Sequence, residues 1–243
     1  MKLHLRFHLL LDMRTVLHIN SSARTARSHT RYLSNLFVRE WRCLRPEDLV
    51  ISREIGTEPP SPVSEAWIAS AFTPPQDRTP AMREALRLSD TLVDELVQAD
   101  LIVLGAPMYN FGMPAQLKAY VDQIIRVGRT FALDVSDEKQ PYRPLLIGKR
   151  MLVITATGDA GYQTGGPLEH LNHLDPHLRT AFGSIGITEI DFAGVSYDEF
   201  LDDRIKRSLA AAEAKVRQIA HQLAHAWGGE VPPFLRPIPL FPA

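Results

Sequence analysis

The chain has 243 residues, of which 45% are hydrophobic and 23% are charged, and its formal net charge at pH 7 is −1. These values are typical of a globular protein with a sizeable core, and the balanced charge provides no global field that would attract nucleic acid or an anionic membrane. Cys43 is the single cysteine. An internal disulfide is therefore impossible, which suits a reducing compartment, and we expect a cytoplasmic protein with no nucleic-acid or membrane partner.

The first twelve residues, MKLHLRFHLLLD, lack the pattern of a targeting segment. Histidine and positive charge interrupt their apolar residues, no small-residue cleavage site follows, and the stretch is far shorter than the roughly 20 residues of a transmembrane helix. We predict three parts: an N-terminal extension over residues 1–12, disordered or loosely attached, one domain over 13–229, and a proline-rich tail over 230–243. The tail is either loose or laid across a partner subunit.

Within the predicted domain, short apolar runs alternate with helical stripes. Residues 16–19 predict a strand, and the spacing of three and four among the apolar residues of 33–41 predicts an amphipathic helix. LVISREI then predicts a second strand. The proline-dense segment 57–80 fits neither period, and we predict a long excursion over the surface, anchored by Trp67 and Phe72.

The next elements repeat the alternation. Thr79 can cap a helix that has Pro80 at its first position. The inner stripe of this helix is predicted to be Leu86, Val93, Leu96 and Val97. LIVLGAP predicts a third strand, followed by a helix that Pro114 opens and Gly128 stops. A loop leads to the fourth strand, MLVITA; a helix around LRTAFGSIG precedes a fifth strand near TEIDFAGV, and a long final helix ends at the glycine pair 228–229.

Five apolar runs separated by helices imply parallel strands joined by right-handed crossovers, because hairpins need far shorter connections. The sequence thus predicts an α/β three-layer sandwich around a five-stranded parallel sheet. In such sheets ligands bind beyond the carboxyl ends of the strands, near the point where the strand order reverses. The loops after the first, third and fourth strands are therefore the candidate binding loops.

The loop after the first strand carries hydroxyl groups at the start of a helix. Ser22 closes the strand, while Ser28, His29 and Thr30 stand where the helix begins. Hydroxyl donors, free backbone N–H groups and the helix dipole together favour a phosphate; the alternative is that Ser28 is only an N-cap. No GxGxxG follows the strand and no GxxxxGK[ST] occurs in the chain, so a single phosphate fits better than a dinucleotide fingerprint or a P-loop.

The loop after the third strand, PMYNFGMP, is apolar where a solvated loop would be polar. Met108, Tyr109 and Phe111 offer apolar faces and Asn110 offers a polar group, a mixture that suits a planar heteroaromatic ring. Packing into the core is the alternative. After the fourth strand, the glycines of ATGDAGYQTGGP allow the backbone to approach the other edge of such a ring, or simply make this loop flexible.

Histidines do not form a convincing metal site. His170, His173 and His177 lie near Asp175 without a tight ligand spacing, and His221 and His225 share one face of the last helix without the glutamate of a metalloprotease motif. We therefore predict no metal and expect the last two histidines at the surface.

Several of these segments together resemble one family, the FMN-dependent NADH azoreductases of the flavodoxin-like fold, which also reduce quinones. The resemblance rests on the serines and Thr30 of the first loop, on PMYNFGMPAQLKAYVD, on TATGD and on FGSIGIT, and it extends from about Met13 to the end of the last helix. It implies that the FMN phosphate binds at Ser22, Ser28, His29 and Thr30. The ring contacts that it implies are Met108, Tyr109, Asn110, Phe111, Ala156, Thr157, Gly158 and Asp159. Where the family usually has a serine, an arginine and two glycines, this chain has ATGD.

The same resemblance implies a flavoprotein oxidoreductase that works as a homodimer. NADH or NADPH would reduce bound FMN and leave, and a quinone or azo compound would then take its place, in a two-step, ping-pong exchange. No catalytic side chain is expected, because the chemistry takes place at N5 of FMN. One alternative is a flavodoxin-type electron-transfer protein without nicotinamide-dependent activity, which the balanced charge disfavours. Another is a domain that has lost flavin and serves only in assembly.

Overall fold

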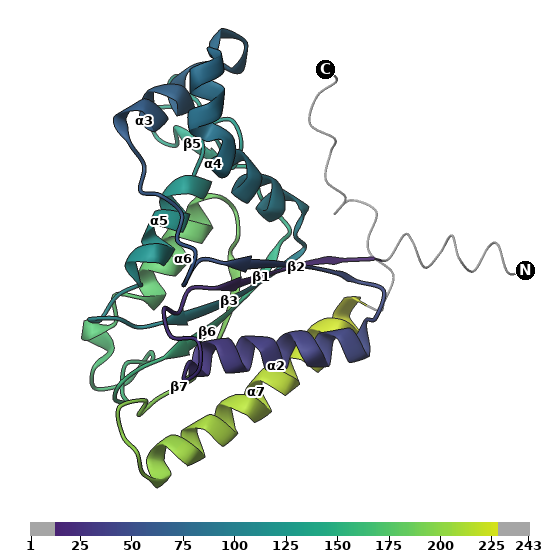
Figure 1. Cartoon of the computed structure of the whole chain (residues 1–243), viewed down its shortest axis with the longest axis vertical. Helices are drawn as coiled ribbons and strands as arrows, with labels where there is room; N and C mark the ends of the chain where they lie inside the picture. Colours follow the sequence, from purple (N-terminus) through teal and green to yellow (C-terminus); the bar gives the residue numbers. More distant parts are fainter. Residues whose placement is uncertain (1–12, 228–243) are drawn as a thin grey trace, which may run out of the picture.

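The computed structural model describes residues 13–227, so the predicted extension 1–12, the tail 230–243 and the stop at glycines 228 and 229 lie outside the described residues. Its centre is a five-stranded parallel sheet with the strand order β2-β1-β3-β6-β7 (Figure 1). The strands are β1 (Thr15–Asn20), β2 (Leu49–Glu54), β3 (Leu101–Pro107), β6 (Arg150–Ala156) and β7 (Glu189–Val195). All five predicted strands are therefore confirmed, together with their parallel pairing.

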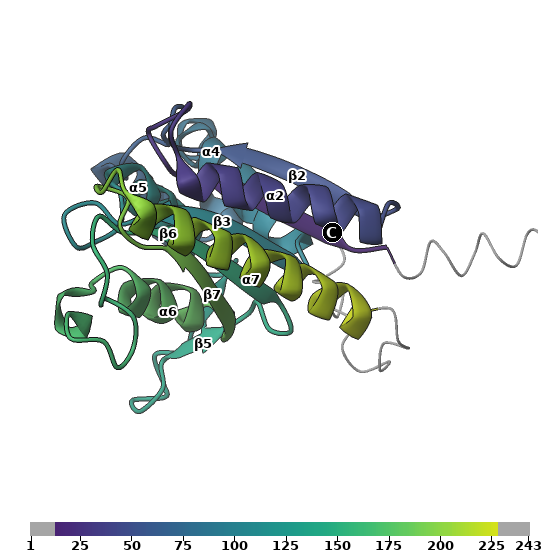
Figure 2. The ribbon, with the colours of Figure 1, turned by 90° about the horizontal axis from the view of Figure 1, so that it is seen from below.

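Helices cover both faces of this sheet, as the predicted three-layer sandwich requires. Figure 2 shows α2 (His29–Leu44) and α7 (Asp203–Trp227) side by side across one face. The other face is covered by α4 (Pro80–Gln98), α5 (Ala115–Ile124) and α6 (Asp175–Ser184). Alternate residues of the strands point into two separate apolar cores, one under each helical layer. No helix within residues 13–227 is long and apolar enough to cross a membrane.

Caps fix where the helices begin. Ser28 Oγ accepts a hydrogen bond from the Arg31 backbone N–H at 3.3 Å, and Thr79 caps α4 with Pro80 at its first position. Both helix starts agree with the sequence prediction. In the α4 stripe, Leu86, Val93 and Leu96 are buried, but Val97 is exposed, so its predicted inward orientation is wrong. Val97 falls in the last turn of α4, just before the helix ends at Gln98.

The proline-dense segment 57–80 contains more structure than predicted. Within it, α3 (Glu65–Phe72) is capped by Ser64, and a 3₁₀ turn, η1, spans Pro75–Asp77. The flanking prolines break the periodicity that would have revealed a helix of only eight residues. Trp67 anchors the segment as predicted: it is buried, and its Nε1–H donates to Gln123 Oε1 at 2.8 Å. Phe72 ends α3 with 63% of its surface exposed, so its predicted anchoring role is wrong.

The predicted loop between α5 and β6 also contains ordered structure. Its strands β4 (Phe131–Leu133) and β5 (Tyr142–Pro144) form a small antiparallel sheet outside the main one. Three-residue strands are too short for an alternating pattern to stand out from the sequence. A further 3₁₀ turn, η2 (Glu169–Leu171), precedes α6.

Candidate functional site

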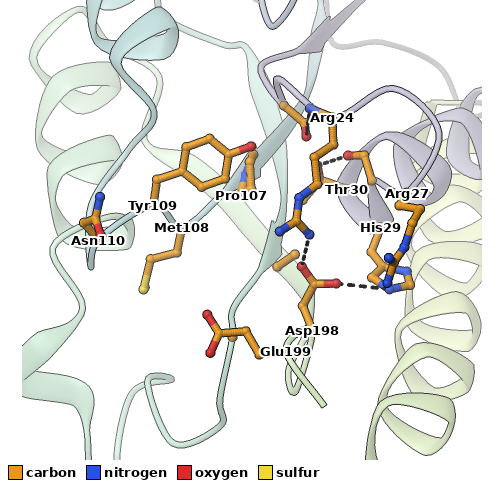
Figure 3. Close-up of a pocket in the computed structure, with 14 residues that line it drawn as sticks. Arg24, Arg27, His29, Thr30, Pro107, Met108, Tyr109, Asn110, Asp198 and Glu199 are labelled. Carbon is orange, nitrogen blue, oxygen red and sulfur yellow. Dashed lines mark hydrogen bonds and ion pairs between the residues drawn. The ribbon is translucent and has the colours of Figure 1, made fainter. Parts of the chain in front are cut away.

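A cavity of about 230 Å³ opens at the carboxyl ends of β1, β3, β6 and β7 (Figure 3). This is the edge at which a sheet of this class binds ligands. Nine of the predicted site residues line it: Ser22, Ser28, His29, Thr30, Met108, Tyr109, Asn110, Ala156 and Gly158. Five further residues line it: Arg24, Arg27, Pro107, Asp198 and Glu199. The three candidate loops converge as expected.

One end of the cavity is built from hydroxyl and backbone N–H groups. Ser28 Oγ lies 3.1 Å from Thr30 Oγ1 at the first turn of α2, and Ser22 Oγ accepts from the Arg24 backbone N–H at 3.2 Å. Ser28 therefore both caps the helix and lines the cavity, so the two interpretations of this residue are compatible. Unpaired N–H groups at a helix start and the positive end of the helix dipole favour an anion at this end.

Arg31 does not line the cavity but holds the loop after β1 through contacts to Glu54 and Ser22. Its guanidinium forms an ion pair with Glu54 and donates to the Ser22 carbonyl oxygen at 3.0 Å. Partial burial of Glu54 opposes ionisation, but the Arg31 guanidinium and the backbone N–H groups of Thr57 and Gly56 hold its pKa below the usual value. The resulting fixed charge pair ties α2 to the end of β2.

A buried polar chain supports the same loop. His18 Nε2 lies 2.9 Å from Ser34 Oγ, which donates to Asn20 Oδ1 at 2.9 Å. Burial of the ring, and next the positive charge of Arg31, lower the pKa of His18 to about 4, so the ring is neutral at pH 7. A Cβ at Gly105 would lie 3.3 Å from both Asn20 Oδ1 and the Thr30 carbonyl oxygen, which shows how closely α2 approaches β3 here.

The opposite end of the cavity is a tight turn. Tyr109 and Gly112 exchange two backbone hydrogen bonds of 2.9 and 3.1 Å, and the two residues between them have positive φ, 48° at Asn110 and 68° at Phe111. This is a two-residue hairpin turn of the primed type, in which glycine or asparagine normally occupies the central positions with positive φ. A phenylalanine with positive φ is strained, and such strain concentrates at functional sites. The turn directs Met108, Tyr109 and Asn110 to the cavity (Figure 3).

Phe111 does not line the cavity. Its side chain is half exposed, and its ring centroid lies 6.4 Å from that of Tyr162. Its carbonyl oxygen accepts from the His173 backbone N–H at 2.9 Å, which ties the turn to the segment before α6. Phe111 therefore stands at the rim, toward the loop that follows β6.

The loop after β6 divides between the cavity and the interior. Ala156 and Gly158 line the cavity, whereas Thr157 is buried and its Oγ1 donates to the Asp159 carbonyl oxygen at 2.6 Å. Thr157 lines a neighbouring cavity of about 400 Å³ instead. Asp159 is exposed and accepts from the Ala160 backbone N–H. Neither Thr157 nor Asp159 lines the predicted site, because successive residues of the extended chain face opposite sides.

Two carboxylates from the loop between β7 and α7 complete the wall. Asp198 and Glu199 follow Tyr197, which has φ 68°, and their backbone N–H groups donate to the carbonyl oxygens of Thr157 and Gly158 at 3.0 and 3.3 Å. A Cβ at Gly158 would lie 2.6 Å from the Glu199 carboxyl group, so glycine leaves room for that side chain. The sequence prediction omits both residues, although the fifth parallel strand ends at the same edge and so indicates that its following loop contributes to the site.

Asp198 links the two loops across the cavity. Its Oδ2 accepts from Arg24 Nη1 at 3.0 Å, and its Oδ1 lies 3.2 Å from His29 Nε2 (Figure 3). Arg27 lines the cavity beside this pair. This end of the cavity thus contains two arginines and one bridging carboxylate.

Metal-ligand clusters of three or more histidine, cysteine or acidic side chains do not occur among residues 13–227. His221 and His225 are exposed on α7, as predicted, and Cys43 is exposed as well.

Comparisons with known proteins agree with this architecture. The model of a family described as having the flavodoxin-like fold matches residues 14–220. The FMN-dependent NADH:quinone oxidoreductase of Opitutus terrae is 48% identical over 217 residues, 88% of this chain and 100% of that protein. The FMN-dependent NAD(P)H:quinone oxidoreductase 1 of Pseudomonas aeruginosa is 42% identical over 211 residues, 83% of this chain and 100% of that protein.

Solved structures confirm the fold. An azoreductase from Bacillus anthracis has a TM-score of 0.77 at 21% identity and covers 86% of this chain and 100% of its own. An FMN-dependent NADH-azoreductase of the same species, in complex with FMN, has a TM-score of 0.76 at 20% identity and covers 87% of this chain and 100% of its own. The resemblance seen in the sequence is therefore confirmed.

Proposed function

The chain belongs to the family with the flavodoxin-like fold, and we propose that it is an FMN-dependent NAD(P)H:quinone oxidoreductase that also reduces azo compounds. The observation that carries the proposal is the convergence of a hydroxyl-rich helix start, an aromatic turn and a glycine-bearing loop on one cavity. Relatives named for this activity, 48% and 42% identical, are matched over their full length.

The chemistry of the cavity fits FMN. Ser22, Ser28 and Thr30 provide hydroxyl groups for a phosphate, and the N–H groups at the start of α2 add donors that favour a negative charge. Met108 and Tyr109 provide a polarisable and an aromatic surface for the face of the ring. Pockets for ligands of drug size typically have about 300–1,000 Å³. At about 230 Å³ the cavity is large enough for the phosphate end, and the ring would lie against the turn at Met108 and Tyr109.

Bound FMN supplies the carrier that accepts a hydride from a nicotinamide and passes the electrons to an acceptor. The residues of this chain bind and orient it. The helix start and Arg27 would hold the phosphate, and the turn at Met108, Tyr109 and Asn110 would contact the ring. Because the strained turn is held by two backbone hydrogen bonds and by the contact to His173, these groups are positioned before the cofactor arrives.

The roles of Phe111, Thr157 and Asp159 in this proposal differ from those of the lining residues. Phe111, at the rim beside Tyr162, is placed to meet the acceptor or the far edge of the ring. Thr157 and Asp159 act through the backbone: the hydroxyl-to-carbonyl bond between them shapes the loop that presents Ala156 and Gly158.

We further propose that the protein is a cytoplasmic homodimer that uses NADH or NADPH. The β4–β5 hairpin and the segment that follows it expose apolar side chains for a partner subunit to cover: Val135, in the hairpin, is 83% exposed, and Ile147, between β5 and β6, is 76% exposed. Such exposure is common at interfaces between subunits. Light scattering of the purified protein distinguishes monomer from dimer, and Val135→Asp should shift a dimer toward the monomer.

The activity is tested with purified, FMN-loaded protein. Anaerobic addition of NADH or NADPH should bleach the flavin absorbance, and a quinone or azo dye should restore it. Parallel double-reciprocal lines are expected for the two-step exchange. A protein that binds no flavin, or that binds FMN without being bleached by either nicotinamide, would contradict the proposal; the second result would favour an electron-transfer protein.

A further inference from the structure

At the phosphate end of the cavity, a bridge joins the loop after the last strand of the sheet, β7, to the loop after the first, β1. Asp198, in the loop between β7 and α7, contacts Arg24 and His29 of the loop after β1 through its two carboxylate oxygens, at 3.0 and 3.2 Å. The Asp198 backbone N–H also donates to the Thr157 carbonyl oxygen at 3.0 Å. Asp198 is thus held at both its side chain and its main chain.

This bridge separates three hollows. Asp198 and Arg27 line the proposed FMN cavity and also two hollows beyond it. One of these, of about 490 Å³, has a mainly apolar lining between the start of α2 and the start of α7 that includes Tyr32, Phe200 and Leu209. The residues that line both the phosphate end and this apolar hollow are Arg27, Ser28, His29 and Asp198.

We propose that Asp198 is a specificity-determining residue that selects a flavin ending at its monophosphate, FMN, over one extended by an adenylate, FAD. The inference rests on the proposed function. Two observations support it: Asp198 lines both the phosphate end and the two hollows beyond it, and its carboxylate, held by Arg24 and His29, lies where a second phosphate would have to pass.

Charge accounts for the discrimination. A monophosphate can use the start of α2 and Arg27 without displacing the bridge. The second phosphate of FAD would have to lie where Asp198 already pairs with Arg24 and contacts the His29 ring, so it would meet a carboxylate instead of a free arginine. Repulsion between like charges at a partly exposed site is sufficient to change relative affinity by about tenfold. The apolar hollow would accommodate adenosine once the bridge is opened.

The test measures binding and not turnover. Dissociation constants of the flavin-free full-length chain for FMN and FAD are obtained from the quenching of flavin fluorescence, for the wild type and for Asp198→Asn. The wild type should prefer FMN, and Asp198→Asn should reduce the ratio of the FAD constant to the FMN constant by about tenfold. Asp202→Asn is the matched control, because this exposed carboxylate of the same loop pairs with Arg204 and lines none of the three hollows.

The outcomes separate this inference from the proposed function. A wild-type chain that binds neither flavin overturns both. A chain that binds FMN, with a ratio that Asp198→Asn leaves unchanged, overturns the role of Asp198 alone. An equal loss of affinity for both flavins also overturns it, because Asp198 would then only position Arg24 and His29. Circular dichroism checks the fold, and Asp198→Ser repeats the test if the asparagine variant is unfolded.

Discussion

Replacing His18 by glutamine should remove a large part of the acid sensitivity of this fold. His18 is buried in β1, and its pKa falls from 6.5 to about 4, mainly through burial and next through the charge of Arg31. Arg42 acts in the same direction and Glu54 in the opposite one. Glutamine carries an amide nitrogen near the position of Nε2, so the contact to Ser34 is retained while the titrating group is lost.

The sign and size of the effect follow from proton linkage. The unfolded chain binds a proton at His18 below about pH 6.5, whereas the folded chain binds one only below about pH 4. The free energy of unfolding is therefore at its full value above pH 6.5 and decreases as the pH falls toward 4. From pH 6.5 to pH 5 the difference spans roughly 1.5 pKa units, which at 1.36 kcal/mol per unit corresponds to a loss of about 2 kcal/mol.

Urea unfolding at pH 7.5 and pH 5 measures this difference. The wild type and His18→Gln both lose stability through their other titrating groups. The free energy of unfolding of the wild type should therefore decrease by about 2 kcal/mol more than that of His18→Gln between the two pH values. His221→Gln, on the exposed face of α7, is the control and should lose as much as the wild type. Equal losses in the wild type and His18→Gln would show that the buried ring does not exclude the proton.

Three further substitutions test other parts of the structure. Ser28→Ala removes the cap of α2 and a hydroxyl of the phosphate end, so thermal unfolding should show a loss of about 1 kcal/mol and FMN titration a weaker affinity; unchanged affinity would place the phosphate elsewhere. Gly56→Ala places a Cβ 2.0 Å from the Ser22 carbonyl oxygen. That atom is backbone, so urea unfolding should show a loss at the upper end of about 1–3 kcal/mol, and a neutral result would mean that the loop moves freely. Trp67→Phe leaves Gln123 Oε1 without its donor and should cost about 1–3 kcal/mol in the same assay; no loss would indicate that α3 is not anchored by this bond.

The fold was predictable where one physical signal dominated. A strand such as LIVLGAP is buried on both faces, and its continuous apolar run identifies it without knowledge of its neighbours. The start of helix α4 is indicated by its N-cap, Thr79, and by Pro80 at its first position. By contrast, α3 has eight residues between proline clusters, and β4 and β5 have three each. Elements this short depend on tertiary contacts such as the Trp67 hydrogen bond, which leave no period in the sequence.

The site was predictable to the level of loops and less so to the level of side chains. Topology alone brings the ends of parallel strands to one edge, so the convergence at Ser28, Met108 and Gly158 was foreseen. Which of two successive residues faces a cavity depends on dihedral angles, and for Phe111 these include a positive φ that is unusual for an aromatic residue. The bridge pairs Asp198 with Arg24, 174 positions away in the sequence, and nothing in the local pattern of either segment indicates the other.

Because the bridge joins residues far apart in the sequence, it also determines when during synthesis the cavity can be completed. A chain leaving the ribosome exposes the serine loop early, but the carboxylates that close the same cavity follow the last strand of the sheet, β7. A complete cavity therefore exists only when nearly the whole described chain has been made and folded. Because a ligand that binds only the native state stabilises it by mass action, flavin supply should protect finished molecules from unfolding and degradation while giving no such help to chains still being translated.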